Sequence, residues 1–374
     1  MSARRAAPLL ALAAALPLVL ARCTVFDGLS ADPPDAGPAE AATPDAPATS
    51  EAGGGCRVLP PSPPSTFVGG DESSFVVVIR SVAFGAPDAG AAPEIGFDLD
   101  GLCSCPEAES CVASRTTPAC DLPGGRDNEA LKLFRAFVAL RGIDLSARAN
   151  ESVATGTHAV LLRVERYNGR DDDSEVTVSA YGSRGLVQPD GAGGITTPVP
   201  PKLTAEDRWS VSKSSVIDEV QLASAQSAVG YVRGRKLVVA MDVTLGVSSD
   251  FRIPIGGGVL VADVVGGPGA YRLSDAVIAG RWSLTDAVTS LGKLRDQDGT
   301  YFCEKRADVT YQAVKSTVCR SADLTKSPKS DRTGAPCDAI SIAVGFDTAP
   351  ASLGVVVPDP PPTPCDALPP DPCN

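Results

Sequence analysis

Alternation of apolar and polar side chains constrains the fold of this chain more than any other feature of its sequence. In the segment 339–346, Ile340, Ile342 and Val344 alternate with smaller or more polar residues, and the segment 238–245 repeats the pattern. Successive side chains of a strand point to opposite faces of a sheet. Both segments are therefore predicted to be strands with one buried face.

Further strands and three helices are predicted along the same stretch of chain. Strand patterns, separated by turns rich in Gly, Asn and Asp, cover 74–84, 157–167, 175–183, 228–233, 258–265 and 271–280. Helical spacing of apolar residues covers 128–140, 284–294 and 308–319. Many strands at short spacing with few helices favour an antiparallel sheet over a parallel α/β sheet. We expect a mainly β protein, an antiparallel β-sandwich of jelly-roll type with about three accessory helices.

The N-terminus has the pattern of an export signal. Arg4 and Arg5 precede an apolar stretch over 6–20 that is short for a transmembrane helix. The sequence 20–23, Leu-Ala-Arg-Cys, then resembles a bacterial lipobox. We therefore expect a signal peptide of lipoprotein type over 1–22, with Cys23 acylated as the new N-terminus.

Residue 22 leaves a second interpretation open, because the position before a lipidated cysteine is normally Gly or Ala and here is Arg22. An ordinary signal peptidase that cuts after Ala21 would release a secreted or periplasmic protein. Cysteine parity favours lipidation, since acylation of Cys23 leaves an even set from the 11 cysteines. The expected location is the outer membrane or cell surface.

The composition divides the exported chain into three parts. Residues 23–65 are rich in Ala, Pro, Asp, Gly and Ser, and hold 6 carboxylates between Asp27 and Glu51 without a Lys or Arg. Such a segment has too little apolar surface to fold and is expected to be a disordered tether. A head domain follows over 66–351, with a Cys-rich insertion at about 96–128. A Pro-rich tail covers 352–374.

The remaining cysteines are expected to form disulfides, as is usual in exported proteins. They are Cys56, Cys103, Cys105, Cys111, Cys120, Cys303, Cys319, Cys337, Cys365 and Cys373. The spacing of the four between 103 and 120 lacks the paired knuckles of a zinc site. Cys103 and Cys105 are too close to bridge, so each should pair with Cys111 or Cys120, in an order that the sequence leaves open. Elsewhere, Cys303–Cys319 and Cys365–Cys373 are expected, with Cys319–Cys337 as the rival to the first.

Two short motifs raise the question of calcium, which is the one cofactor that the sequence suggests. Asp98-Leu99-Asp100-Gly101 and Asp296-Gln297-Asp298-Gly299 alternate carboxylates before a Gly, as calcium loops do. Neither fits an EF-hand, because Gly96 and Leu294 fall at the first ligand position. A different oxygen cage is predicted around Asp98, Asp100, Asp121, Asp127 and Asn128. Ordinary acidic turns are the alternative.

No catalytic motif stands out. The chain has one histidine, His158, which is expected to be a strand-end residue, and it lacks G-x-S-x-G and H-E-x-x-H. Trp209 and Trp282 are expected in the core. The net charge of −12 makes nucleic acid an implausible partner.

Both ends of the chain carry a resemblance. The run Cys23-Thr24-Val25-Phe26-Asp27-Gly28-Leu29-Ser30, the tether, and Pro336-Cys337-Asp338-Ala339-Ile340-Ser341-Ile342 followed by Phe346 and Ala349-Pro350-Ala351 resemble uncharacterised cell-surface lipoproteins of myxobacteria. The likeness covers the leader, the tether and the last strand. It implies a location and no activity.

We therefore expect a lipid-anchored, disulfide-stabilised envelope protein that is not an enzyme and acts as a binding or structural module. Its partners would be the membrane, through the N-terminal lipid, and a protein or glycan ligand. The alternative is a glycan-binding or glycan-cleaving protein, which would need two facing carboxyl groups about 5 to 9.5 Å apart in a cleft if it cleaves.

Overall fold

The computed structural model describes residues 57–84, 95–105, 109–115, 119–141, 143–192, 194–296 and 298–373. The expected signal peptide over 1–22, the lipidation site Cys23, the first disulfide cysteine Cys56 and most of the tether lie outside the described residues. Among the helices of the described ranges, none is long and apolar enough to cross a membrane.

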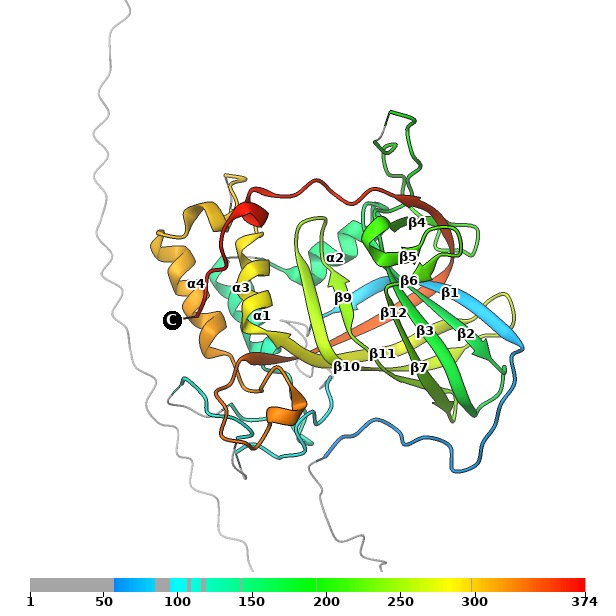
Figure 1. Ribbon diagram of the computed structural model, residues 1–374, viewed down its shortest axis with the longest axis horizontal. Helices are drawn as coiled ribbons and strands as arrows, with labels where there is room; N and C mark the ends of the chain where they lie inside the picture. The colour runs from blue at the N-terminus through cyan, green and yellow to red at the C-terminus, as the bar shows by residue number, and fades with distance from the viewer. Residues whose placement is uncertain are drawn as a thin grey trace, which may run out of the picture. The chain divides into compact units, whose positions relative to one another are not determined.

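Eight antiparallel strands close into a barrel (Figure 1). In barrel order they are β1 (Ser73–Ala83), β2 (Ala159–Tyr167), β3 (Asp173–Ser183), β7 (Gln226–Arg233), β8 (Lys236–Ala240), β10 (Arg252–Val265), β11 (Arg272–Ser283) and β12 (Ala339–Val357). β12 pairs with β1, with Val78 opposite Ala349, and this pairing closes the sheet.

The expected jelly-roll sandwich is therefore wrong, although the mainly β content and most of the strands were predicted. A sandwich consists of two sheets that each keep two edge strands, whereas closure leaves the barrel strands without an edge. Period-two alternation indicates only that one face of a strand is buried. It is the same for the inner face of a barrel and the inner face of a sandwich, and so it could not decide between them.

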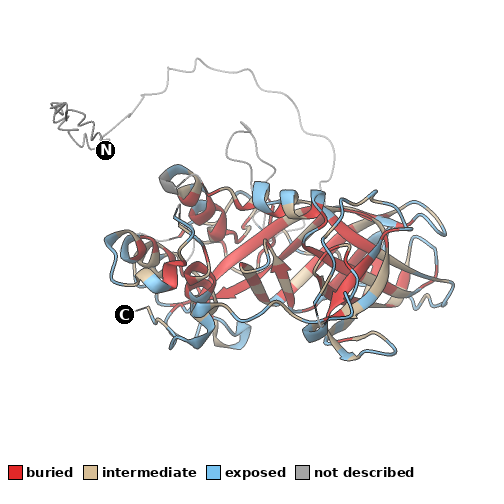
Figure 2. Ribbon diagram, turned by 90° about the horizontal axis from the view of Figure 1, so that it is seen from above, coloured by how far each residue is buried: buried red, intermediate tan, exposed pale blue. Residues whose placement is uncertain are grey.

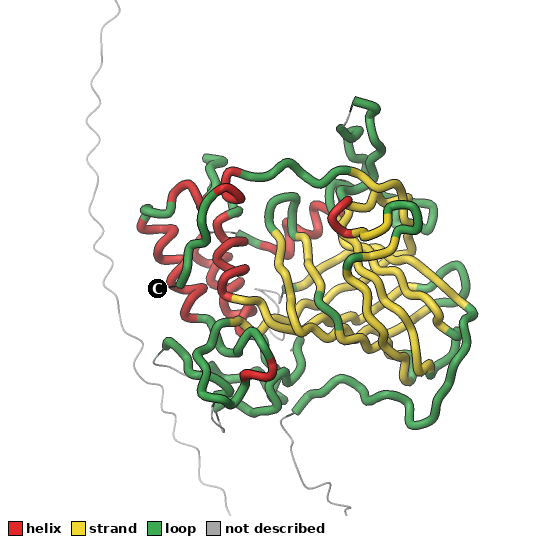
Figure 3. The backbone as a smooth tube through the Cα atoms, in the orientation of Figure 1, coloured by secondary structure: helices red, strands yellow, loops and turns green. Residues whose placement is uncertain are grey.

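Smaller strands and helices surround the barrel. β9 (Val243–Gly246) pairs with the start of β10, β4 (Arg208–Ser212) runs parallel to the end of β12, and β5 (Val216–Asp218) forms a hairpin with β6 (Ala223–Ser224). The α-helices are α1 (Glu129–Arg141), α2 (Leu145–Ala154), α3 (Leu284–Gly292) and α4 (Val309–Arg320), and the 3₁₀ turns are η1 (Lys213–Ser215), η2 (Phe302–Lys305), η3 (Pro328–Ser330) and η4 (Pro364–Ala367). α1, α3 and α4 gather at one end of the barrel (Figure 3). Of the four helices, α2 was not predicted.

The barrel interior is filled by side chains. Figure 2 shows most of the strand surface as buried, and the inward residues form one apolar cluster that includes Leu162, Leu260 and Ile342. An eight-stranded barrel is just wide enough for side chains to fill it. At one rim Trp282 lies against Phe134 of α1, with ring centroids 6.2 Å apart. Trp282 and Trp209 are both fully buried, which confirms that they are core residues.

Of the described disulfides, one closes a short loop in the Cys-rich insertion and three join more distant segments of the chain. The bonds are Cys105–Cys120, Cys111–Cys337, Cys303–Cys365 and Cys319–Cys373, and Cys103 is also disulfide-bonded. The predicted pairs Cys303–Cys319 and Cys365–Cys373 are wrong, and so is the rival Cys319–Cys337. Cys105–Cys120 is one of the bonds that the sequence allowed. The expectation that Cys103 pairs with Cys111 or Cys120 is wrong, because Cys111 pairs with Cys337, outside the insertion, and Cys120 with Cys105.

The course of the tail explains the error in the pairing. After β12 the chain runs back along the outside of the barrel to the helices (Figure 1). Cys365 thus reaches Cys303 beside α3, and Cys373 reaches Cys319 at the end of α4. The Pro-rich tail is covalently fastened to the head at two points.

The last residues before the head also lie on the barrel. Val58 packs against the cluster on the outer face of β8, β10 and β11, and its amide donates to the Gly124 carbonyl at 2.9 Å. The hydroxyl of Tyr231 donates to the Pro61 carbonyl. Residues 57–62, which the composition assigned to the tether, therefore belong to the folded part.

Candidate metal centre

The loop over 97–101 lies across the outside of the barrel and positions two acidic residues. Phe97 and Leu99 pack against apolar residues of β8, β10, β11 and β12. Arg281 of β11 is 3% exposed, and its Nη2 donates to the Leu99 carbonyl at 2.9 Å. The same guanidinium pairs with Asp331 at 2.6 Å. The loop backbone is thus held by the barrel wall beneath it.

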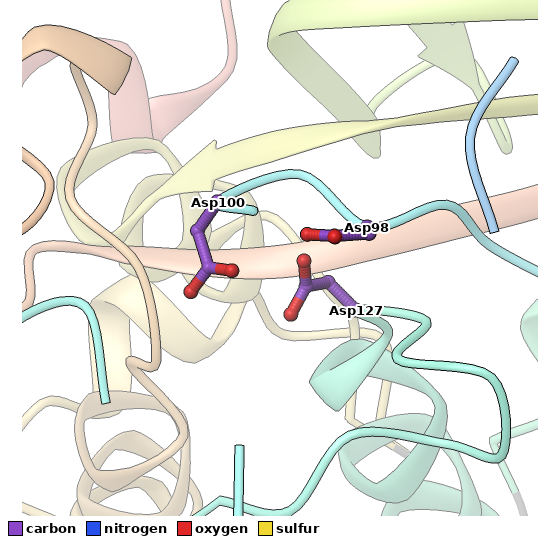
Figure 4. Close-up of side chains that lie close together, drawn as sticks. All are labelled: Asp98, Asp100 and Asp127. Carbon is purple, nitrogen blue, oxygen red and sulfur yellow. The ribbon is translucent and has the colours of Figure 1, made fainter. Parts of the chain in front are cut away.

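Three carboxylates converge beside this loop. One oxygen from each of Asp98, Asp100 and Asp127 lies within 4.8 Å of the others (Figure 4). Asp98 and Asp100 belong to the loop, and Asp127 stands two residues before the first residue of α1. The N-terminus of a helix favours negative charge, which helps to place Asp127 there.

Backbone amides orient the three side chains. Asp98 Oδ1 accepts from the Gly101 amide at 2.6 Å, and Asp127 Oδ2 accepts from the Leu99 amide at 2.6 Å. Asp100 Oδ1 accepts from the Leu102 amide at 2.8 Å. The side chain of Asp98 is 0% exposed, and its Oδ2 is buried without a hydrogen-bond partner among the described residues. That oxygen forms a long ion pair with Arg57 and keeps lone pairs that a metal ion would bind.

Arginines lie near the cluster, although they form few ion pairs with its carboxylates. Arg332 Nη2 donates to the Asp100 backbone carbonyl at 2.6 Å. The Nε of Arg57 lies 3.7 Å from Asp98 Oδ2, and this long ion pair is the one recorded for the three carboxylates among the described residues. Burial, together with the charge of Asp100, raises the pKa of Asp127 to about 9. Burial also raises the pKa of Asp98. Crowded, buried carboxylates are stable only if they bind protons or a cation.

Asp121 and Asn128, the other two predicted ligands, differ in their placement. Asp121 accepts from the Ser104 amide at 2.7 Å and its side chain hydrogen-bonds that of Asp127, but it is not one of the three carboxylates whose oxygens converge. Burial first, and then the charge of Asp100, raise its pKa. Asn128 turns away: its Nδ2 donates to the Ile95 carbonyl at 3.2 Å, and its Oδ1 accepts from the Ala343 amide at 3.1 Å. Asn128 ties the start of α1 to β12 and is not part of the cluster.

The second acidic motif has its own cation. Lys305 Nζ lies 3.0 Å from an oxygen of Asp296 and 2.7 Å from an oxygen of Asp298. The pKa of Asp298 is lowered to about 2, chiefly because Lys305 donates a hydrogen bond to its carboxylate. The two copies of the motif thus differ in ways that matter for a metal: the second is exposed and neutralised by a lysine, whereas the first is more buried and faces a third carboxylate.

His158 stands immediately before β2, as expected of a strand-end residue, and it is 6% exposed. Burial lowers its pKa to about 4, so the imidazole is neutral at physiological pH. It lines a polar pocket with Arg252 and Ser212, which the sequence did not indicate. His158 precedes β2, whereas Ser212 belongs to β4 and Arg252 to β10, so no local sequence pattern links the three residues. The same is true of Arg281 beneath the metal centre.

No family model, curated protein or solved structure matches this chain.

Proposed function

We propose that this chain is an exported, lipid-anchored envelope protein that acts as a binding or structural module, and that calcium bound by Asp98, Asp100 and Asp127 fastens its Cys-rich insertion to the barrel. The leader that ends at Cys23 supports the anchor. The resemblance of both chain ends to myxobacterial cell-surface lipoproteins supports the location.

The disulfides support an oxidising compartment. Cys111–Cys337 joins segments 226 residues apart, and Cys303–Cys365 and Cys319–Cys373 hold the tail. Structural disulfides persist in exported proteins and are rare in the cytosol.

The observation that carries the calcium proposal is the contrast between the two acidic motifs. Asp296 and Asp298 share the ammonium of Lys305. Asp98 and Asp100 instead face a third carboxylate, Asp127, and the one ion pair of these three among the described residues is the 3.7 Å contact of Arg57 with Asp98. Carboxylate oxygens are hard ligands that suit calcium or magnesium. Calcium tolerates irregular coordination, whereas magnesium requires a nearly octahedral arrangement of ligands. Because these carboxylates are also held by hydrogen bonds from backbone amides, calcium is the better match.

A calcium ion here would have a structural role. Asp98 and Asp100 precede the loop that Cys105–Cys120 closes, and Asp127 follows it. An ion that joins the three would close the base of the insertion and connect it to α1 and the barrel. Module sites outside the cytosol bind calcium with dissociation constants of about 10⁻⁴–10⁻³ M. At millimolar calcium such a site adds about 1 kcal/mol to the free energy of unfolding.

Thermal unfolding tests this role. The melting temperature of the wild type should rise by a few degrees between EDTA and about 1 mM calcium. Asp98→Asn should abolish the rise. The matched control is Asp298→Asn, which alters the lysine-neutralised motif and should keep the rise. The calcium site would be refuted if calcium did not change the melting temperature of the wild type, or if it changed the melting temperatures of the two variants equally.

A further inference from the structure

A pocket opens at the rim of the barrel, and none of its lining residues belongs to the two acidic motifs. Its volume is about 290 Å³, close to the lower end for small-molecule sites. The walls come from the residues at and before the start of β2, the end of β3, η1, the start of β7, β9 and the start of β10. The residues that matter for its chemistry are His158, Ser212, Ser215, Gln226 and Arg252.

The pocket carries positive charge that forms no ion pair among the described residues. Arg252 is half-buried in its wall, and among the described residues its guanidinium has no carboxylate within ion-pair distance. Arg184, which acts electrostatically on His158, donates to the Pro358 carbonyl at 2.9 Å and likewise has no acidic partner there. Asp359 is a negative charge near the rim, where it accepts from the amide of Ser214 at 3.0 Å and from its hydroxyl at 2.7 Å, and it forms no ion pair with Arg252 or Arg184.

Neutral polar groups complete the wall. Ser215 Oγ accepts from the Gly182 amide at 2.9 Å, which leaves its own O–H able to donate. The side-chain amide of Gln226 makes one long hydrogen bond, in which Nε2 donates to Thr244 Oγ1 at 3.4 Å. Such groups can rearrange toward a ligand at little cost.

His158 adds a buried, neutral ring to the pocket wall. The ring lines the pocket, is buried, and its Nε2 has no hydrogen-bond partner among the described residues. Burial first, and then the charges of Arg252 and Arg184, hold the pKa of His158 well below its usual range. The depressed pKa agrees with a positive potential around the ring.

We propose that this pocket binds a small polar anion, whose carboxylate or phosphate oxygens meet Arg252 and whose other polar groups meet Ser212, Ser215 and Gln226. A guanidinium recognises both oxyanions through paired, charge-assisted hydrogen bonds. The site is separate from the calcium centre and uses none of its residues.

Calorimetric titration of the purified protein in EDTA tests the site with three probes: glucuronate, inorganic phosphate and glucose. Glucuronate and glucose have similar size and hydroxyl groups and differ in charge. We expect one or both anions to bind and glucose not to bind. Arg252→Gln should weaken anion binding roughly 10- to 100-fold, the range for losing a charged hydrogen-bond partner. Arg148→Gln, which removes an exposed arginine of α2, is the control and should bind as the wild type does.

Arg252→Lys keeps the inference falsifiable if Arg252→Gln fails to fold. The lysine retains the charge and loses the paired geometry, so binding should fall between that of the wild type and zero. The choice between glucuronate and phosphate identifies the oxyanion. Absence of binding for both anions, binding of glucose as tight as that of glucuronate, or a folded Arg252→Gln with undiminished binding would overturn the proposal.

Discussion

Gly246 lies so close to His158 that a Cβ atom at position 246 would stand 1.7 Å from Nε2. Because Gly246 of β9 has no side chain, the imidazole has room to lie in the pocket wall. Replacing Gly246 with Ala should displace the ring or shift β9 and destabilise the fold by about 1–3 kcal/mol, the usual cost of overpacking.

The same contact predicts non-additivity. His158→Ala removes the ring that the new methyl group would meet, so the double variant should lose less than the sum of the two single variants. Urea unfolding of the four proteins measures the coupling. Additive losses would mean that the two residues are not in contact in solution.

A second prediction concerns pH. His158 has a pKa of about 4 in the folded protein, against an ordinary value of 6.5. As the pH falls, the unfolded chain binds the proton first, so this contribution to stability is complete above about 6.5, declines toward pH 4 and is lost below. Its full size is about 3 kcal/mol. Arg252 and Arg184 are the charged groups that act on the ring, and both oppose its protonation.

Because the chain has 1 histidine, its imidazole C–H resonances can be followed by NMR without ambiguity. They should titrate near pH 4. His158→Gln should remove this part of the pH dependence of unfolding. A midpoint near 6.5 in the folded protein would contradict the burial of the ring.

The tail disulfides give a third prediction. Cys303–Cys365 closes a loop of 62 residues, so replacing both cysteines with Ala should lower the free energy of unfolding by about 4 kcal/mol through the entropy of the unfolded chain. Peptide mapping without reduction should recover Cys303 joined to Cys365 and Cys319 joined to Cys373. A Cys303–Cys319 peptide would restore the pairing that the sequence suggested and contradict the described course of the tail.

A fourth prediction concerns the anchor. If Cys23 is acylated, Cys23→Ser should move the protein from the membrane fraction to the soluble fraction, because the lipid would be its means of attachment. Mass spectrometry of the wild-type N-terminus is the check. A soluble wild type that begins at Arg22 would mean ordinary secretion.

The sequence predicted the barrel strands because their alternation is a local property. It placed β2 and β3 within two residues of their observed bounds, but it read 238–245 as one strand. The strand is interrupted at Met241 and Asp242, because β8 pairs with the middle of β10 and β9 pairs with its start. Closure of the barrel depends on the pairing of β1 with β12, in which Val78 lies opposite Ala349. This pairing joins distant parts of the chain, and no local sequence pattern indicates it.

The acidic centre was partly predictable for the same reason. Asp98 and Asp100 share a short motif, and Asp127 stands near the cysteines that hold the insertion. Asn128 was grouped with them by position, but its amide is needed by the backbone of β12. Arg281 and the pocket residues could not be found, because folding brings them together from distant strands.

The calcium centre can be tested most directly by anomalous scattering from a crystal grown in millimolar calcium. We predict a single anomalous peak between Asp98, Asp100 and Asp127, with carboxylate oxygens at about 2.3–2.6 Å from it. No comparable peak should appear at Asp296 and Asp298, where Lys305 supplies the positive charge. A map without a peak among Asp98, Asp100 and Asp127 at that calcium concentration would contradict the proposed site.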